Sequence, residues 1–284
     1  MGFSKYKLLV DKRCDFVDCD IVVRTYNEAG NVIPFIRSIK KNNNVRVNFI
    51  FLDSGSDDGT LELLKSQDVT IFTIEKEFFN FGETLDFLFS CAKSEWVFSF
   101  SAHVGIKGEN VLEKSIYYMK KYNAVSGYMR QMENEKNGCS ILEKIFIDRC
   151  FYKTDKPVII KGTSQIPSNA AAVYRKEAWE KCRFGIINGS EDKNWARENY
   201  KKGATMIYIG NIVVEHSHNE HPSKYYKRML MNYREQHRMG VKRNCYIQFI
   251  KVFLGIMCFG MKFCAFDAFE YAKANYRASK EIYK

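Results

Sequence analysis

An acidic pair followed by an indole marks the stretch GSEDKNWARENYKKG, residues 189–203. Glu191 and Asp192 are adjacent at what reads as the start of a helix, and Trp195 follows about one turn later. Carboxylates are favoured at a helix N-terminus by the helix dipole, so a solvated helix start is one interpretation. A general base that takes a proton from a substrate hydroxyl is the other. These residues alone leave both interpretations open.

A second group of chemically capable residues is the histidine-rich stretch EHSHNEH, residues 215–221. Residues two apart on a strand face the same side, so we expect His216 and His218 to act together in preference to His221. Three histidines within six residues are also typical of a zinc hydrolase. That alternative explains none of the loops described next.

Alternating strands and helices are expected to position these groups. Apolar runs at 21–23, 48–52, 69–74 and 96–100 read as strands, and the segments 29–41 and 82–93 have helical spacing. This alternation predicts a βαβ series with a mostly parallel sheet. Ligands of such sheets bind at the carboxyl ends of the strands, which directs attention to the loops after Val23, Leu52 and Phe100.

Beyond residue 124 the pattern changes. The segments 123–131 and 204–218 read as further strands, and 140–152 and 175–182 as helices. The segment VIIKGTSQI, 158–166, reads as a loop that crosses near the site. We predict one domain over 1–240 and a helical extension over 241–284.

The loop DSGSDDGT begins with an aspartate at a strand end. The carboxylate of Asp53 can accept hydrogen bonds from a base N–H or a ribose hydroxyl, and the small residues after it let the backbone approach a ligand. Asp58 and Thr60 are explained equally well as caps of the next helix.

Composition restricts the class of protein. The chain has 284 residues, 46% of them hydrophobic, which excludes a disordered protein. Its net charge of +11 favours polyanionic partners such as nucleic acid, phosphorylated substrates or an anionic membrane. Nine cysteines without a CxxC pair argue against a disulfide framework or a zinc ribbon, and the N-terminus has no apolar signal region.

The apolar tail 245–266 is interrupted by Gln248, Lys251 and Lys262, which places it at the border of what can span a membrane. A helix packed on the domain and an interfacial helix lying on a membrane are the two main interpretations, the second supported by basic flanks. The upstream stretch KYYKRMLMNYREQHR, 224–238, interleaves basic and aromatic residues, a pattern of nucleic-acid binding and of lipid surfaces.

Several motifs, in order, resemble family 2 glycosyltransferases. VVRTYNEAGNVIPFIRSI and FIFLDSGSDDGT look like the beginning of such an enzyme. AVSGYMRQ, SNAAAVYRKEAWE, SEDKNWA and VVEHSHN resemble its rhamnosyltransferase-like branch. The similarity spans roughly residues 18–221. It implies a GT-A fold, which is a Rossmann-like mixed sheet with helices on both faces, and inverting transfer from a nucleotide sugar.

The resemblance also implies roles for individual residues. Asp192 is expected to be the catalytic base, with Glu191 in support. The nucleotide sugar is expected at Thr25, Tyr26, Glu28, Asp53, Ser54, Gly82, Ser101 and His103. The acceptor is expected at Trp195, whose indole offers a face for a sugar ring, and at Arg130, Gln131 and Asn169.

One position departs from the family pattern. Where the family carries Asp-x-Asp, whose carboxylates hold a divalent metal, this chain reads Ser101-Ala102-His103. Imidazole suits Mn²⁺ or softer ions better than Mg²⁺. Either His103 binds a metal with His216 and His218, or it contacts the diphosphate directly.

The sequence therefore predicts an inverting glycosyltransferase of bacterial surface polysaccharide synthesis, located in the cytoplasm and peripherally on the inner face of the plasma membrane. Its expected partners are a nucleotide sugar, a glycan or polyprenyl-linked acceptor and an anionic membrane surface, and not nucleic acid. The alternative from another class is a non-catalytic nucleotide- or glycan-binding protein, which the missing Asp-x-Asp favours.

Overall fold

Two compact units make up the chain in the computed structural model, which describes residues 4–162, 167–238, 240–259 and 265–283. The first unit comprises Met1–Gln131, Lys153–Ile187 and Glu191–His216, and the second comprises Met132–Tyr152, Asn188–Ser190 and Ser217–Lys284. These units do not follow the predicted boundary at residue 240. The second unit takes in helix α5 (Ile141–Cys150) because the apolar residues of that helix pack with those of the C-terminal helices.

The N-terminal half of the first unit confirms the predicted alternation of strands and helices. Four strands run parallel, with β2 paired to both β3 and β5, and β3 paired to β4. In chain order these elements are β2 (Cys19–Thr25), α1 (Val32–Asn42), β3 (Val47–Asp53), α2 (Thr60–Lys65), β4 (Thr70–Thr73), α3 (Phe81–Cys91) and β5 (Trp96–Ser101). Their β-branched and aromatic runs are buried, as expected of strands covered on both faces.

The remaining strands make the sheet mixed. Next to β5 the order continues through β9, β7, β10 and β6, and the pairings of β5 with β9, of β9 with β7 and of β10 with β6 are antiparallel. These strands are β6 (Gly105–Lys107), β7 (Ser126–Met132), β9 (Ala171–Arg175) and β10 (Met206–Glu215). Two short strands, β1 (Lys7–Val10) and β8 (Val158–Ile159), pair antiparallel with β4 and β10. The expectation of a mostly parallel sheet therefore holds for the N-terminal half only, whereas the predicted mixed α/β class is confirmed.

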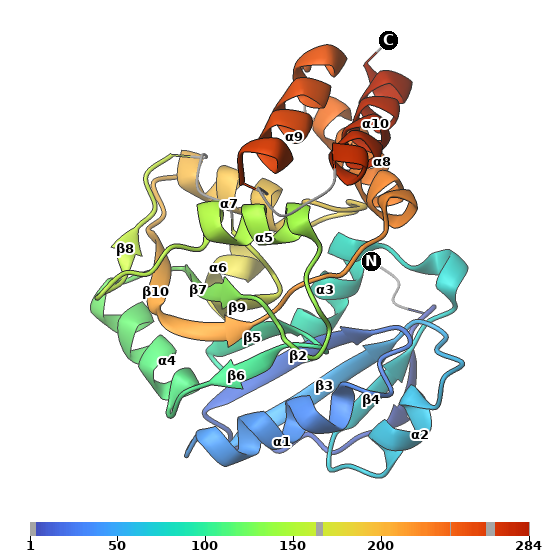
Figure 1. Ribbon diagram of the computed structural model, residues 1–284. Coiled ribbons are helices and arrows are strands. Elements are labelled where there is room, and N and C mark those ends of the chain that lie inside the picture. The colour runs from blue at the N-terminus through green and yellow to red at the C-terminus, as the bar shows by residue number, and fades with distance from the viewer. Residues whose placement is uncertain (1–3, 163–166, 239, 260–264, 284) are drawn as a thin grey trace. The chain divides into compact units, whose positions relative to one another are not determined.

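Helices cover both faces of this sheet (Figure 1). On one face, Ile21 and Val23 of β2 share an apolar core with residues of α1 and of α4 (Val111–Lys121). On the other, Phe89 of α3 contacts Tyr174 and Trp179, which brings in α6 (Lys176–Lys181). Successive residues of a strand point to opposite faces, so Val23 joins the first core and Arg24 points toward α3.

The second unit is helical. Its C-terminal part consists of α8 (Pro222–Arg238), α9 (Cys245–Phe259) and α10 (Ala265–Ile282), which share an apolar cluster with α5. Residues 260–264, which include Lys262 of the predicted tail segment, and residues 163–166 of the predicted crossing loop lie outside the described residues. Within the described ranges, every helix falls short of the length or the hydropathy that a membrane span requires.

A close backbone contact fixes the start of α3. The amide of Gly82 donates to the carbonyl of Ile187 over 2.9 Å, and a Cβ on Gly82 would lie 2.1 Å from the carbonyl oxygen of Gly185. The side chain of Asn80 caps the helix and also accepts from the amide of Ile187. Gly82, predicted as part of the nucleotide-sugar site, thus has a packing reason to be glycine.

We expect Gly82→Ala to lower the free energy of unfolding by about 1–3 kcal/mol, because the added methyl group must displace the 185–187 backbone. Urea denaturation would measure this change. Gly255→Ala is the matched control: it lies inside α9 with open space around its Cβ, so the same substitution should be neutral or stabilising by up to about 1 kcal/mol. Equal effects of the two substitutions would contradict the packing role of Gly82.

Candidate functional site

Two loops meet at the carboxyl ends of β2 and β3. Thr25 pairs in register with Asp53, and its hydroxyl donates to the Asp53 carboxylate over 3.1 Å. The amide and the hydroxyl of Ser54 both donate to the carbonyl oxygen of Thr25, over 3.0 and 3.1 Å. Three of the predicted donor-site residues are therefore neighbours, as parallel strand ends require.

The carboxylate of Asp53 organises its own loop. It is buried and accepts hydrogen bonds from the amides of Gly55 and Ser56 and from the hydroxyls of Ser56 and Thr25. A carboxylate has about four acceptor positions, and these donors use all four. A direct hydrogen bond from Asp53 to a nucleotide, as the sequence predicted, would require one loop donor to leave.

Beside these loops, an exposed aromatic ring lies against an ammonium group. The Nζ of Lys76, which begins the short helix η1 (Lys76–Phe78), lies 2.6 Å from the Tyr26 hydroxyl and 4.1 Å from the centre of its ring. Tyr26 is 41% exposed. An exposed ring suits stacking with a base, and an ammonium suits a phosphate.

His103 follows the end of β5 and is held by a carboxylate. Its Nδ1 lies 2.9 Å from Oε1 of Glu28, whose Oε2 accepts from the side-chain amide of Asn31 over 2.7 Å. Glu28, predicted to contact the nucleotide sugar, thus lies behind the imidazole. Ser101 is half-buried and donates its amide to the carbonyl of Ala170.

The imidazole of His216 stacks on that of His103, with ring centres 4.9 Å apart and planes inclined by 17°. Its Nδ1 lies 2.9 Å from Oε1 of Gln131. The amide nitrogen of Gln131 donates to the hydroxyl of Ser168 over 2.8 Å, which fixes the orientation of this amide. Gln131, predicted to bind the acceptor, is therefore a buried support of His216.

The prediction that His216 and His218 lie on a strand is wrong, because β10 ends at Glu215. Both histidines follow the strand, and His218 belongs to the second unit, where its carbonyl accepts from the amide of Ser140. His221, at the start of α8, is exposed and lies 3.0 Å from the hydroxyl of Ser223.

The donor chemistry of His103 and His216 fits a metal ion. Oxygen acceptors at both Nδ1 atoms favour the tautomer with the proton on Nδ1 and the lone pair on Nε2. An oxygen partner behind each imidazole is the usual arrangement of metal-ligating histidines. The two residues offer ring nitrogens within 4.8 Å of each other, a separation at which modest rotation lets them share one ion.

Glu191 and Asp192 begin α7 (Glu191–Lys201) and have different surroundings. Glu191 is buried, and its Oε1 lies 3.1 Å from the Nη2 of Arg24 and 3.2 Å from the side-chain amide of Asn169. Arg24 in turn donates to the carbonyl of Phe81 over 2.7 Å. The charge of Glu191 is therefore neutralised inside the protein by a guanidinium that is itself held in place.

Asp192 is held by backbone amides and not by a paired guanidinium. Its two oxygens accept from the backbone amides of Asn169, over 3.2 Å, and Lys193, over 2.7 Å. The residue is half-buried, so part of it stays accessible. Burial, followed by the nearby charge of Glu191, raises the pKa of Asp192 from 3.8 to about 6.

The prediction that Trp195 presents a face to a sugar ring is wrong. Trp195 is fully buried, and its indole N–H donates to the carbonyl of Cys182 over 2.5 Å. Its ring packs edge-on against Tyr174. Asn169, predicted as an acceptor residue, is also buried, between the two acids, and Arg130 is half-buried on β7.

Three residues of this site were missed by sequence reasoning: Arg24, Lys76 and Tyr174. The hydroxyl of Tyr174 donates to the side-chain oxygen of Asn169 over 2.5 Å and so orients the amide that contacts Glu191. Arg24 carried a usable signal, since a charged residue near the end of an apolar strand needs a buried partner. The sequence around Lys76 and Tyr174 carries no comparable signal.

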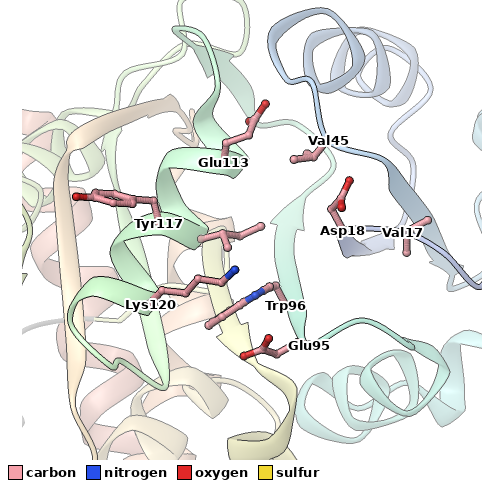
Figure 2. Close-up of a pocket in the computed structure, with 9 residues that line it drawn as sticks. Val17, Asp18, Val45, Glu95, Trp96, Glu113, Tyr117 and Lys120 are labelled. Carbon is pink, nitrogen blue, oxygen red and sulfur yellow. The ribbon is translucent and has the colours of Figure 1, made fainter.

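A cavity of about 570 Å³ lies at the opposite ends of the strands. It is bounded by α4 through Glu113, Tyr117 and Lys120, and by Asp18 and Trp96 near the amino ends of β2 and β5 (Figure 2). Ligands of open α/β sheets bind at the carboxyl ends of strands, so this cavity is not the candidate site.

Comparisons with known proteins agree with the sequence resemblance. Residues 20–183 match the family described as Glycosyl transferase family 2. The chain is 25% identical over 219 residues to the O-antigen chain rhamnosyltransferase RfbN of Salmonella typhimurium, covering 73% of this chain and 69% of RfbN. It is 27% identical over 227 residues to the O-antigen chain rhamnosyltransferase WbaN of Salmonella anatum, with the same coverage.

Solved structures share the fold. The mannosyltransferase PcManGT from Pyrobaculum calidifontis, solved in complex with GDP-Man and Mn²⁺, matches 97% of this chain and 75% of its own, with a TM-score of 0.59 and 14% identity. S. aureus TarS 1–349 in complex with UDP-GlcNAc matches 90% of this chain and 79% of its own, with a TM-score of 0.55 and 13% identity. These similarities confirm the expected GT-A fold.

We expect Arg24→Ala to destabilise the protein by on the order of 3 kcal/mol, because it leaves Glu191 buried without its cation. In a double-mutant cycle with Glu191→Gln, measured by urea denaturation, most of this cost should disappear. Arg46→Ala is the control, since Arg46 pairs with Asp18 at the surface, where loss of an ion pair costs about 0–1 kcal/mol. An unchanged cost in the Glu191→Gln background would show that Arg24 acts through other contacts.

Proposed function

Because the chain belongs to glycosyltransferase family 2, we propose that it transfers a sugar from a nucleotide donor to a glycan hydroxyl with inversion at the anomeric carbon. The observation that carries this proposal is the unequal acidic pair at the start of α7. Glu191 is ion-paired with Arg24, whereas Asp192 is part-accessible with a pKa raised to about 6. Two carboxylates with divergent environments are the usual arrangement when one of them is a base.

Asp192 serves as the base in the proposed reaction. Its carboxylate takes the proton of the acceptor hydroxyl while the hydroxyl oxygen forms a bond to the anomeric carbon. The bond from that carbon to the phosphate oxygen breaks on the opposite face, and the nucleoside diphosphate leaves. The amides of Asn169 and Lys193 hold the carboxylate in one orientation. Glu191 has a positioning role, because Arg24 and Asn169 occupy its oxygen.

The donor is proposed to lie over the carboxyl ends of β2, β3 and β5. Tyr26 offers a ring for the base, and the Lys76 ammonium lies beside that ring. Asp53, Thr25 and Ser54 shape the loop that receives the nucleotide. The names of RfbN and WbaN support a rhamnosyl donor and a polysaccharide acceptor, which we propose is polyprenyl-linked and met on the inner face of the plasma membrane.

A divalent ion, Mn²⁺ in preference to Mg²⁺, is proposed to be held by His103 and His216. When bound, it would offset the charge of the donor diphosphate. Glu28 and Gln131 orient the two imidazoles from behind. The sequence prediction of His218 as a further ligand stays a prediction. Direct contact of His103 with the diphosphate is the alternative.

Transfer should depend on the ionised form of Asp192. Since burial raises its pKa to about 6, log(kcat/KM) is expected to be flat above pH 7 and to fall by about one unit per pH unit below 6. Asp192→Asn should lower kcat by on the order of 10³-fold and remove this acidic limb from the residual rate. The rate of transfer would be measured from product mass after incubation with a panel of nucleotide sugars and a polyprenyl-linked glycan.

Asp18→Asn, at the amino end of β2, is the matched control and should leave the rate and its pH profile unchanged. Thermal unfolding of each variant tests the fold independently. Near-normal turnover by a folded Asp192→Asn would remove Asp192 as the base. Nucleotide binding without transfer to any acceptor would instead favour the non-catalytic binding protein.

Metal binding is expected to depend on both imidazoles and on what holds them. Calorimetry with Mn²⁺ alone should show a site that His103→Ala abolishes and that Gln131→Leu weakens about 10–100-fold, because Gln131 orients His216. His221→Ala, which replaces an exposed histidine just before α8, should bind Mn²⁺ as the unaltered protein does. If Mn²⁺ does not bind but His103→Ala still weakens binding of a nucleoside diphosphate, the alternative that His103 contacts the diphosphate directly is correct.

A further inference from the structure

Helix α9 exposes a continuous apolar face. Its residues at spacings of three and four are solvent-exposed although they are apolar, with exposed fractions from 42 to 69%: Tyr246, Ile247, Ile250, Leu254 and Met257. The opposite face of the helix is used for packing, since Ile256 is buried with Ala268 and Tyr271 of α10. The exposed face is therefore not needed to hold the second unit together.

Aromatic residues of α10 extend this surface. The ring centres of Tyr276 and Tyr246 are 5.4 Å apart. Phe269 is exposed, and its ring centre lies 6.1 Å from that of Phe249. Aromatic rings that border an apolar surface are typical of membrane–water interfaces, where one edge is apolar and the other is wet.

Cations surround the apolar face. On α10, Lys273 lies over the ring of Phe269 and Lys280 over that of Tyr276. Lys251 lies on α9 itself, and Lys242 and Arg243 are exposed just before its first turn. Residues 217–284 contain thirteen Lys and Arg against five Asp and Glu, so most of the excess positive charge of the chain lies in this segment. Near this face, Oε1 of Glu270 lies 3.8 Å from the Nζ of Lys273. Glu270 does not pair with the other cations named here.

We propose that the apolar face of α9, with the aromatic and lysine side chains of α10 beside it, docks on the surface of an anionic phospholipid bilayer. The apolar residues would enter the boundary between head groups and acyl chains, and the lysines would lie at the level of the lipid phosphates. The proposal places the 15 described residues of α9 in the plane of the membrane, with the apolar face toward the acyl chains. This proposal names the surface that would bring the proposed enzyme to a lipid-linked acceptor.

Vesicle sedimentation without nucleotide or acceptor tests the surface independently of sugar transfer. The full chain should bind phosphatidylcholine vesicles that contain phosphatidylglycerol, bind pure phosphatidylcholine far more weakly, and lose affinity as salt is raised. Leu254→Glu should weaken binding at least tenfold. The double variant Lys273→Gln, Lys280→Gln should weaken it by about fivefold for each lysine.

Matched controls come from the first unit. Leu63→Glu replaces a leucine on α2 that is also exposed, and the double variant Lys41→Gln, Lys65→Gln removes two exposed lysines. Both controls should bind the vesicles as the unaltered chain does. Circular dichroism checks that each variant folds. If Leu254→Glu does not fold, the double variant Lys273→Gln, Lys280→Gln tests the proposal in its place.

Three results would overturn the proposal. The first is no binding of the full chain to phosphatidylglycerol vesicles, and the second is equal binding by the α9 and α10 variants. The third is a dimer in analytical ultracentrifugation that Leu254→Glu converts to a monomer, since the apolar face would then join two copies of the chain. Loss of sugar transfer with intact vesicle binding would concern the catalytic proposal alone.

Discussion

Two adjacent carboxylates at one helix start, one buried and one half-buried, are the constraint on which the site depends. Like charges this close cannot both be held inside a protein without compensation. Arg24 pairs with Glu191, whereas two backbone amides hold the carboxylate of Asp192. Burial, and after it the nearby charge of Glu191, raises the pKa of Asp192 toward neutral pH. A carboxylate in that state is a weaker acid and hence a stronger base than one in water, which is the property a proton acceptor requires.

The N-terminal half of the fold could be predicted because each strand is a short apolar run and each connection is a helix of clear period. Parallel βαβ units leave few choices of order or handedness. The second half could not be predicted in this way. Strands β9, β7 and β6 find antiparallel partners far away in the chain, and β6 has only three residues. Short strands of this kind acquire their pairing from the rest of the sheet.

In the candidate site, the positions of the functional residues were predictable from the strand ends, but their hydrogen-bond and ion-pair partners were not. The helical period explains the error at Trp195. Glu191, Trp195 and Asn199 are spaced by four residues and share the buried face of α7, whereas Asp192 is rotated by about 100°. The same spacing that placed an indole near the acids therefore directs it into the core. The pairs formed by Arg24 with Glu191 and by Gln131 with His216 join residues 167 and 85 positions apart, beyond any local pattern.

The replacement of Asp-x-Asp by Ser101-Ala102-His103 changes the charge that a donor diphosphate would meet in the proposed function. Two carboxylates would repel the phosphates, so that a cation between them becomes necessary. Neutral imidazoles do not repel phosphate, and a protonated one attracts it. Glu28 lies behind His103, with its Oε1 2.9 Å from Nδ1, and so fixes the orientation of the imidazole from that side. A site built in this way needs a metal less than one built from aspartates does, which is why metal binding and diphosphate binding have to be measured separately.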